Sequence, residues 1–141
     1  MKDLVKILEE IQELLQQICS ITANQTTVLL EQGGTIEEEE EALSVLEQMV
    51  DYKDNLINLV EEKELKFERL YAENKTRISS PEEIKLFKHH VASILAKKEE
   101  IKEAEQANVA IMQGRVNRRV KQVELPKNAE QVIHAYKKVK Y

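Results

Sequence analysis

The stretch RISSPEEIKLFKHHVASIL, residues 77–95, contains a helix boundary followed by the start of a long amphipathic helix. Ser80 is a typical N-cap residue, Pro81 suits the first helical position, and Glu83 completes a capping box. Apolar residues then recur at three- and four-residue steps, at Ile84, Phe87, Val91, Ile94 and Leu95. This pattern predicts an α-helix that begins at residue 81.

The same helical spacing precedes this boundary in two further segments. Residues 2–32 carry two apolar stripes that together form one broad face. These stripes are Leu4, Leu8, Ile11, Leu15 and Ile18, and Ile7, Leu14, Ile21 and Val28. Thr22 and Gln25 interrupt the face, which predicts a more polar stretch of core. Gly33 then fits the left-handed residue that ends many helices.

A second predicted helix covers residues 36–77. Thr35 and Glu38 form a capping box at its start. Its apolar seam includes Leu43, Leu46, Met49, Val50, Leu56, Ile57, Val60, Phe67, Leu70 and Tyr71. Lys53 and Lys63 lie on the same seam, where their stems can cover apolar surface while their ammonium groups reach water. The acidic run 37–41 is more typical of a solvated first helical turn than of a binding tail.

The third predicted helix covers residues 81–124 and ends before Pro126. Its seam becomes polar at Lys98, Glu105 and Asn108. Residues 126–141 form a short amphipathic tail with apolar residues at helical spacing. This tail is too short to be a stable helix alone, so we expect it to be mobile, or docked loosely, until a partner binds.

These segments predict an all-α fold, an elongated antiparallel three-helix hairpin or bundle over residues 1–125 with the tail at 126–141. With 3 Gly and 2 Pro in 141 residues, long uninterrupted helices are expected. Short connections place consecutive helices side by side. The predicted core includes Leu15, Ile18, Leu46, Val60, Phe67, Val91, Ile94 and Ile101.

Charge is unevenly distributed along the chain. The overall net charge is −5, whereas residues 114–141 carry 8 Lys or Arg and 2 Asp or Glu. The basic end is either a solvated helix terminus or an interaction tail. Nucleic-acid binding is not expected, because the body is acidic and the tail contains no recognisable nucleic-acid-binding module.

No constellation for catalysis is present in the sequence. His89 and His90 are adjacent and point to different helical faces. Cys19, the only cysteine, lies in an apolar stripe. This position predicts that its side chain packs in the core and has no catalytic role. We therefore expect no enzymatic activity, no metal and no cofactor. No signal sequence or membrane span is evident, which predicts a cytoplasmic protein without membrane insertion.

Three segments together resemble the FlgN-type flagellar export chaperones. The first is the paired-stripe helix followed by Gln16, Gln17 and Gln25. The second is the central stretch 46–70, with YKDNLI at 52–57 and FERLY at 67–71. The third is IKEAEQAN at 101–108 before a less regular C-terminus. The basic tail and Pro126 depart from the family pattern.

The resemblance implies a cytoplasmic chaperone that binds hook–filament junction subunits, the flagellar hook-associated proteins, and keeps them unassembled before type III protein export. Components of the export apparatus would be further partners. Cargo binding would involve the C-terminal apolar positions Ile111, Met112, Val116, Val120, Val123, Val132, Ile133 and Tyr136. Basic residues would act on orientation and encounter rate, namely Arg115, Arg118, Arg119, Lys121, Lys137 and Lys138.

Other functions fit the same pattern. Helical hairpins of this size could serve a different flagellar or virulence type III cargo. A self-assembling coiled-coil scaffold without cargo is also compatible with long stripes and short loops. In another interpretation, Val116, Val120 and Val123 simply complete the core of the third helix.

Overall fold

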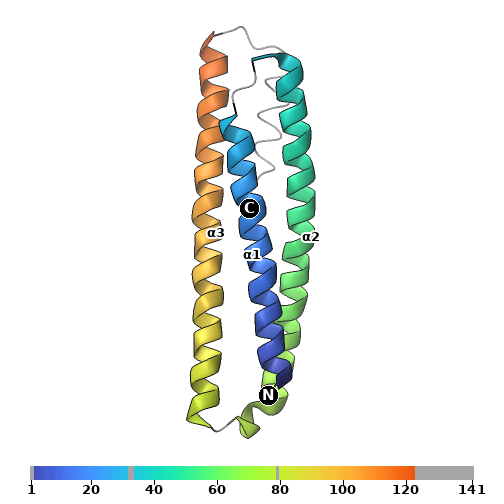
Figure 1. The fold of residues 1–141 in the computed structure, drawn as a ribbon, viewed down its shortest axis with the longest axis vertical. Helices are drawn as coiled ribbons and strands as arrows, with labels where there is room; N and C mark the ends of the chain where they lie inside the picture. The colour runs from blue at the N-terminus through green and yellow to red at the C-terminus, as the bar shows by residue number, and fades with distance from the viewer. Residues whose placement is uncertain (1, 32–33, 79, 123–141) are drawn as a thin grey trace. The chain divides into compact units, whose positions relative to one another are not determined.

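Three α-helices form the structure, a computed structural model that describes residues 2–31, 34–78 and 80–122, with side chains through Asn117. They are α1 (Lys2–Leu30), α2 (Ile36–Asn74) and α3 (Pro81–Gln122), and a short 3-10 helix, η1 (Lys75–Arg77), follows α2 (Figure 1). The helices pack against each other, and no strand occurs among the described residues. The predicted all-α class is therefore confirmed.

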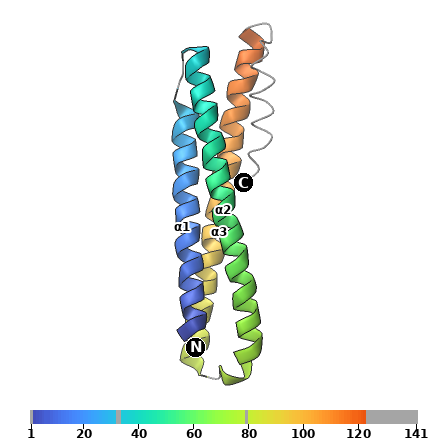
Figure 2. The same cartoon turned by 90° about the vertical axis from the view of Figure 1, so that its right-hand side faces the viewer.

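The chain divides into two compact units, and each contains a segment of all three helices. The first unit comprises residues 1–20 and 53–101, and the second comprises residues 21–52 and 102–141. Within each unit the α2 segment runs antiparallel to the segments of α1 and α3 (Figures 1 and 2).

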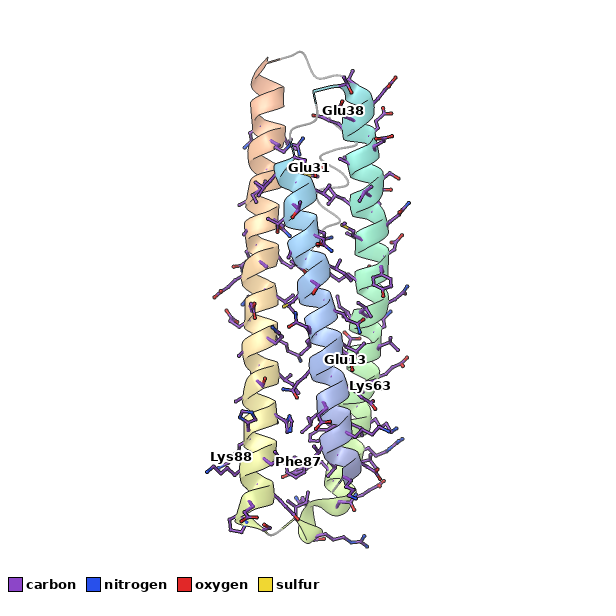
Figure 3. The ribbon with its side chains drawn as sticks, viewed as in Figure 1. Glu13, Glu31, Glu38, Lys63, Phe87 and Lys88 are labelled. Atoms are coloured by element: carbon purple, nitrogen blue, oxygen red, sulfur yellow. The ribbon has the colours of Figure 1, made fainter. Side chains whose placement is uncertain are left out.

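Both α2 and α3 begin where the sequence predicts, and a side-chain cap is present at α2. The Glu38 amide donates to Thr35 Oγ1 over 3.1 Å, as a capping box requires. The Glu38 carboxylate (Figure 3) accepts from the Gly34 amide at 2.8 Å instead of reaching the amide of Thr35. At α3, the Ile84 amide donates to the carbonyl of Ser80. Gly33, the predicted left-handed residue, lies outside the described residues.

The ends of α1 and α2 differ from prediction by a few residues. α1 ends at Leu30, against a predicted end at 32, whereas the predicted end of the third helix at 124 lies outside the described residues. α2 ends at Asn74, whose side-chain amide donates to the Leu70 carbonyl, and the last predicted turn is the 3-10 helix η1. A 3-10 turn commonly tightens the end of an α-helix in this way.

The core of the first unit is built from one apolar face of each helix. Phe87 points inward from α3 (Figure 3), and its ring meets Phe67 edge-on at a centroid distance of 6.4 Å. Phe67 itself is only half-buried. The buried apolar residues of this unit are Leu4, Ile7, Leu8, Ile11, Leu15, Ile18, Leu56, Val60, Phe87, Ile94 and Ile101. Among the predicted core residues in this unit, Leu15, Ile18, Val60, Ile94 and Ile101 are confirmed.

The prediction that Val91 is buried is wrong, because its side chain is 39% exposed. The buried row on α3 advances in steps of seven through Phe87, Ile94 and Ile101. At 100° per residue, Val91 is displaced from that row by roughly 50° around the helix. The face of α3 that packs against the other helices is therefore narrower than the apolar pattern suggests.

The prediction that Lys53 reaches water is also wrong, because the residue is only 1% exposed. Burial lowers the pKa of its ammonium group to about 8, while the nearby Asp54 carboxylate acts in the opposite direction. Desolvation disfavours the charged form of a buried lysine, which explains the direction of this shift.

Lys63, the second lysine on the seam, is half-buried and contacts α1 (Figure 3). Its Nζ donates to Glu10 Oε2 over 2.5 Å. This hydrogen bond holds the pKa of the Glu10 carboxyl below its ordinary value. Lys63 therefore links the α1 and α2 segments of the first unit.

The helices of the described ranges include none that is both long enough and apolar enough to cross a membrane.

Candidate partner-binding site

A small apolar pocket lies in the second unit, where the end of α1 meets the start of α2 and the far part of α3. Its volume is about 40 Å³. That space accommodates one or two water molecules, so a large side chain could enter only if the walls moved apart. The lining residues are Leu29, Glu39, Ala42, Leu43, Leu46, Met112, Arg115 and Val116.

Three of the lining residues belong to the apolar core of this unit. Leu29, Leu46 and Met112 are buried together, and Val28, Met49 and Ile111 pack against them. Burial of Leu46 was predicted from its seam and is confirmed.

Arg115 forms one side of the pocket and joins all three helices. Its Nη1 donates to the carbonyl oxygen of Leu29 over 2.8 Å, and its Nη2 lies 3.8 Å from Glu39 Oε1. Leu29 belongs to the last turn of α1, where carbonyl groups lack partners within the helix and favour a nearby cation. Arg115 was predicted to steer a partner. In this structure its guanidinium group is engaged within the protein.

The predicted cargo-binding residues divide into two groups. Met112 and Val116 are buried and line the pocket, and Ile111 is half-buried beside them. These three residues therefore lie together at one place. The side chains of Val120, Arg118, Arg119 and Lys121 are outside the described part of the structure, as are Val123, Val132, Ile133, Tyr136, Lys137 and Lys138.

A layer of buried polar residues crosses the second unit, as the interrupted stripes predict. Thr22 Oγ1 donates to Glu105 Oε1 over 3.4 Å, and Asn108 Nδ2 donates to the carbonyl oxygen of Thr22 over 3.1 Å. The Thr26 hydroxyl lies within hydrogen-bonding distance of both Asn108 Oδ1 and the Thr22 carbonyl oxygen. Gln25 is buried in the same stretch of α1. Such partnered polar groups tie the helix segments to one register.

An apolar row with carboxylates along one side of it runs along α2 in the second unit. The row is Ile36, Leu43 and Val50, which follow one another every seven residues and so share one side of the helix. Ile36 is 55% exposed, and Leu43 and Val50 are half-buried. The carboxylates beside it belong to the exposed residues Glu40, Glu47 and Asp51.

We call these six residues the apolar-acidic face of α2. It adjoins the pocket, because Leu43 belongs to both. The sequence pattern predicts that Leu43 and Val50 belong to the buried seam and that the acidic residues are solvated. The seven-residue spacing of Ile36, Leu43 and Val50 is the signal that could have revealed the face.

Among the described residues, the histidines and the cysteine all lie in the first unit. His90 Nδ1 is 2.7 Å from Gln12 Oε1, so a histidine of α3 bonds to a glutamine of α1. Cys19 is half-buried, and burial raises the pKa of its thiol. That shift disfavours the reactive thiolate. The described residues include no group of three or more His, Cys, Asp or Glu that could hold a metal ion.

The pocket, the buried polar layer and the apolar-acidic face of α2 thus lie within one unit. The pocket and the face of α2 present apolar and acidic surface. Comparison with known proteins assigns no family to this arrangement, since no family model, no curated protein and no solved structure matches the chain.

Proposed function

We propose that this protein is a cytoplasmic export chaperone of the FlgN type, which binds an amphipathic helical end of a hook–filament junction subunit before type III secretion. The proposal begins from the sequence resemblance in the three segments 1–32, 46–71 and 101–108. Covering an exposed amphipathic helix with an apolar groove removes a surface that would otherwise self-associate.

The observation that carries the proposal is the pocket in the second unit. Met112 and Val116, two of the residues that the resemblance associates with cargo, line it, and Ile111 packs against the adjoining core. The pocket opens between helix segments, and a partner helix typically inserts apolar side chains into such a groove at one-turn intervals. Because the pocket is small, we propose that cargo binding widens it between α2 and α3.

Binding to purified junction subunits tests this proposal. Leu43→Asp places a charge on the pocket wall at a half-exposed position, so the bundle should retain its helicity while affinity falls at least tenfold. Truncation after Gln122 tests the contribution of the C-terminal residues. The matched control is Leu65→Asp, which changes an exposed leucine of α2 in the first unit and should leave affinity unchanged.

Two results would count against the proposal in different ways. If Leu43→Asp and the truncated protein both fold and bind with unchanged affinity, cargo does not use this pocket. If the intact protein binds none of the junction subunits, the chaperone assignment itself is wrong.

One observation favours a second candidate, a self-assembling coiled-coil scaffold. Ile84, Val91 and Leu95 are all substantially exposed and share one side of α3 in the first unit. An exposed apolar stripe with helical spacing is typical of a helix–helix interface. Light scattering decides between the two candidates. A stable oligomer that Val91→Asp dissociates supports the scaffold, whereas a monomer that binds junction subunits supports the chaperone.

A further inference from the structure

We propose that residues 127–141 of this chain bind as a helix along the apolar-acidic face of α2. The inference does not depend on the proposed chaperone function. It rests on three properties of the second unit: the partly exposed apolar row on α2, the carboxylates beside that row, and the position of the described end of α3.

The face is complementary in charge to the segment. Residues 36–52 of α2 contain seven carboxylates and no Lys or Arg. Residues 127–141 contain four Lys and a single Glu. Opposite charges around an apolar centre select one partner over others and fix its orientation.

The apolar residues are complementary as well. In the segment they recur at helical spacing, at Ala129, Val132, Ile133, Tyr136 and Val139. A helix of 15 residues is too short to be stable in water unless its apolar side is covered. The row Ile36, Leu43 and Val50 offers an apolar strip of about 21 Å, at 1.5 Å per residue, and the 15-residue segment would be about 22 Å long.

Chain connectivity brings the segment to this face. The ion pair between Arg115 and Glu39 places that part of α3 level with the first turn of α2. From Arg115, α3 continues to Gln122, about 10 Å further along its axis. The four residues 123–126 can span roughly 13 Å, which is more than the usual 8–10 Å between packed helices.

Pro126 favours a break in the helix at this point, so the chain can turn back. A segment that turns back here meets Ile36 first and runs in the same direction as α2. Lys127 then lies near Glu40, and Lys137 and Lys138 lie near Glu47. Lys140 lies near Asp51. This order matches the positions of the carboxylates along the face.

Amide hydrogen exchange on the full-length protein tests the docking. The amides of residues 132–139 should exchange at least tenfold more slowly than those of a free peptide of residues 127–141. Replacing Glu40→Lys together with Glu47→Lys should reduce this protection roughly tenfold, and adding the complementary changes Lys127→Glu and Lys137→Glu should restore it. Restoration by the complementary change distinguishes direct pairing from general loosening.

The matched control is Glu61→Lys with Glu68→Lys. These glutamates continue the seven-residue spacing of Glu40 and Glu47 on α2 but belong to the first unit, beyond the reach of a 15-residue helix. This variant should leave protection unchanged. Leu43→Asp gives a second readout, since it removes the central apolar contact and should abolish protection.

Three results would overturn the proposal. Exchange of residues 132–139 at the rate of the free peptide would show that the segment does not dock. Equal loss of protection in the control would show that the pairing is not specific to this face. Protection that appears only with rising concentration, with a doubled mass, would assign the face to the segment of a second copy instead.

Discussion

Asn108 on α3 donates its side-chain amide to the backbone carbonyl of Thr22 on α1 over 3.1 Å, and both residues are buried. The Thr22 carbonyl is also within 3.1 Å of the Thr26 hydroxyl. A buried polar group of this kind allows one axial position of α1 against α3 within the second unit. Sliding either helix by a turn would leave the amide without its partner, at the cost of desolvation.

The first prediction concerns this amide. Asn108→Ala should lower the free energy of unfolding by about 2–3 kcal/mol, because it removes buried hydrogen bonds and leaves a small cavity. Urea denaturation monitored by circular dichroism measures the change. The control is Asn117→Ala at an exposed site on the same helix, where the cost should stay below about 0.5 kcal/mol. Equal effects at both sites would show that the polar layer contributes nothing specific.

The second prediction concerns Arg115, which bonds the end of α1 and lies beside Glu39. Arg115→Met keeps an apolar stem of similar length and removes the donors. Stability should fall by about 1 kcal/mol, since a charged donor at a helix C-terminus is lost. Lys97→Met, which removes an exposed ion pair with Glu100, should change stability by less than about 0.5 kcal/mol. Thermal unfolding at a single pH measures the stability of both variants relative to the wild-type protein.

Helix starts could be predicted because they depend on a few local residues. The start of α2 is predicted by Thr35 and Glu38, and the start of α3 by Ser80 and Pro81. In each case the signal lies within one helical turn, and the helices begin at Ile36 and Pro81. The polar layer was predictable for a similar reason, since polar residues on an otherwise apolar stripe are visible in the sequence.

The width of each buried face could not be predicted in the same way. Val91 lies near the edge of the apolar face of α3, and Lys53 lies near the edge of the apolar face of α2. Whether a residue at such an edge is buried depends on how closely the neighbouring helix packs there. Tertiary packing exposed Val91 and buried Lys53. The pocket has the same origin, because it exists only where segments of three helices meet.

The third prediction uses this difference between two apolar residues. Ile18→Ala should cost about 2–5 kcal/mol, because Ile18 is almost completely buried and its truncation leaves a cavity. Val91→Ala should cost less than about 1 kcal/mol, since the side chain is already partly in water. Unfolding curves with a common slope allow direct comparison of the midpoints. A large cost at Val91 with an intact monomer would contradict the exposed position of this residue.

The fourth prediction concerns the buried Lys53, whose pKa is about 8 in the folded protein against 10.5 for an ordinary lysine. Between these two values the unfolded chain binds more protons than the folded protein. Stability attributable to Lys53 must therefore rise as pH increases from about 8 to 10.5. Below pH 8 both states carry the proton, and the full cost of burying the charge opposes folding.

Lys53→Met replaces the ammonium group with an apolar side chain of similar length and removes this dependence. The variant should gain stability relative to the wild type at pH 7, and the difference should shrink by about 1–3 kcal/mol by pH 10. Comparing the two proteins at each pH cancels the titration of groups that both contain. Urea unfolding at pH 7, 8, 9 and 10 measures the difference, and Lys66→Met provides the control at an exposed site of α2. A difference between wild type and Lys53→Met that stays constant over this range would show that the folded protein does not depress the pKa of Lys53.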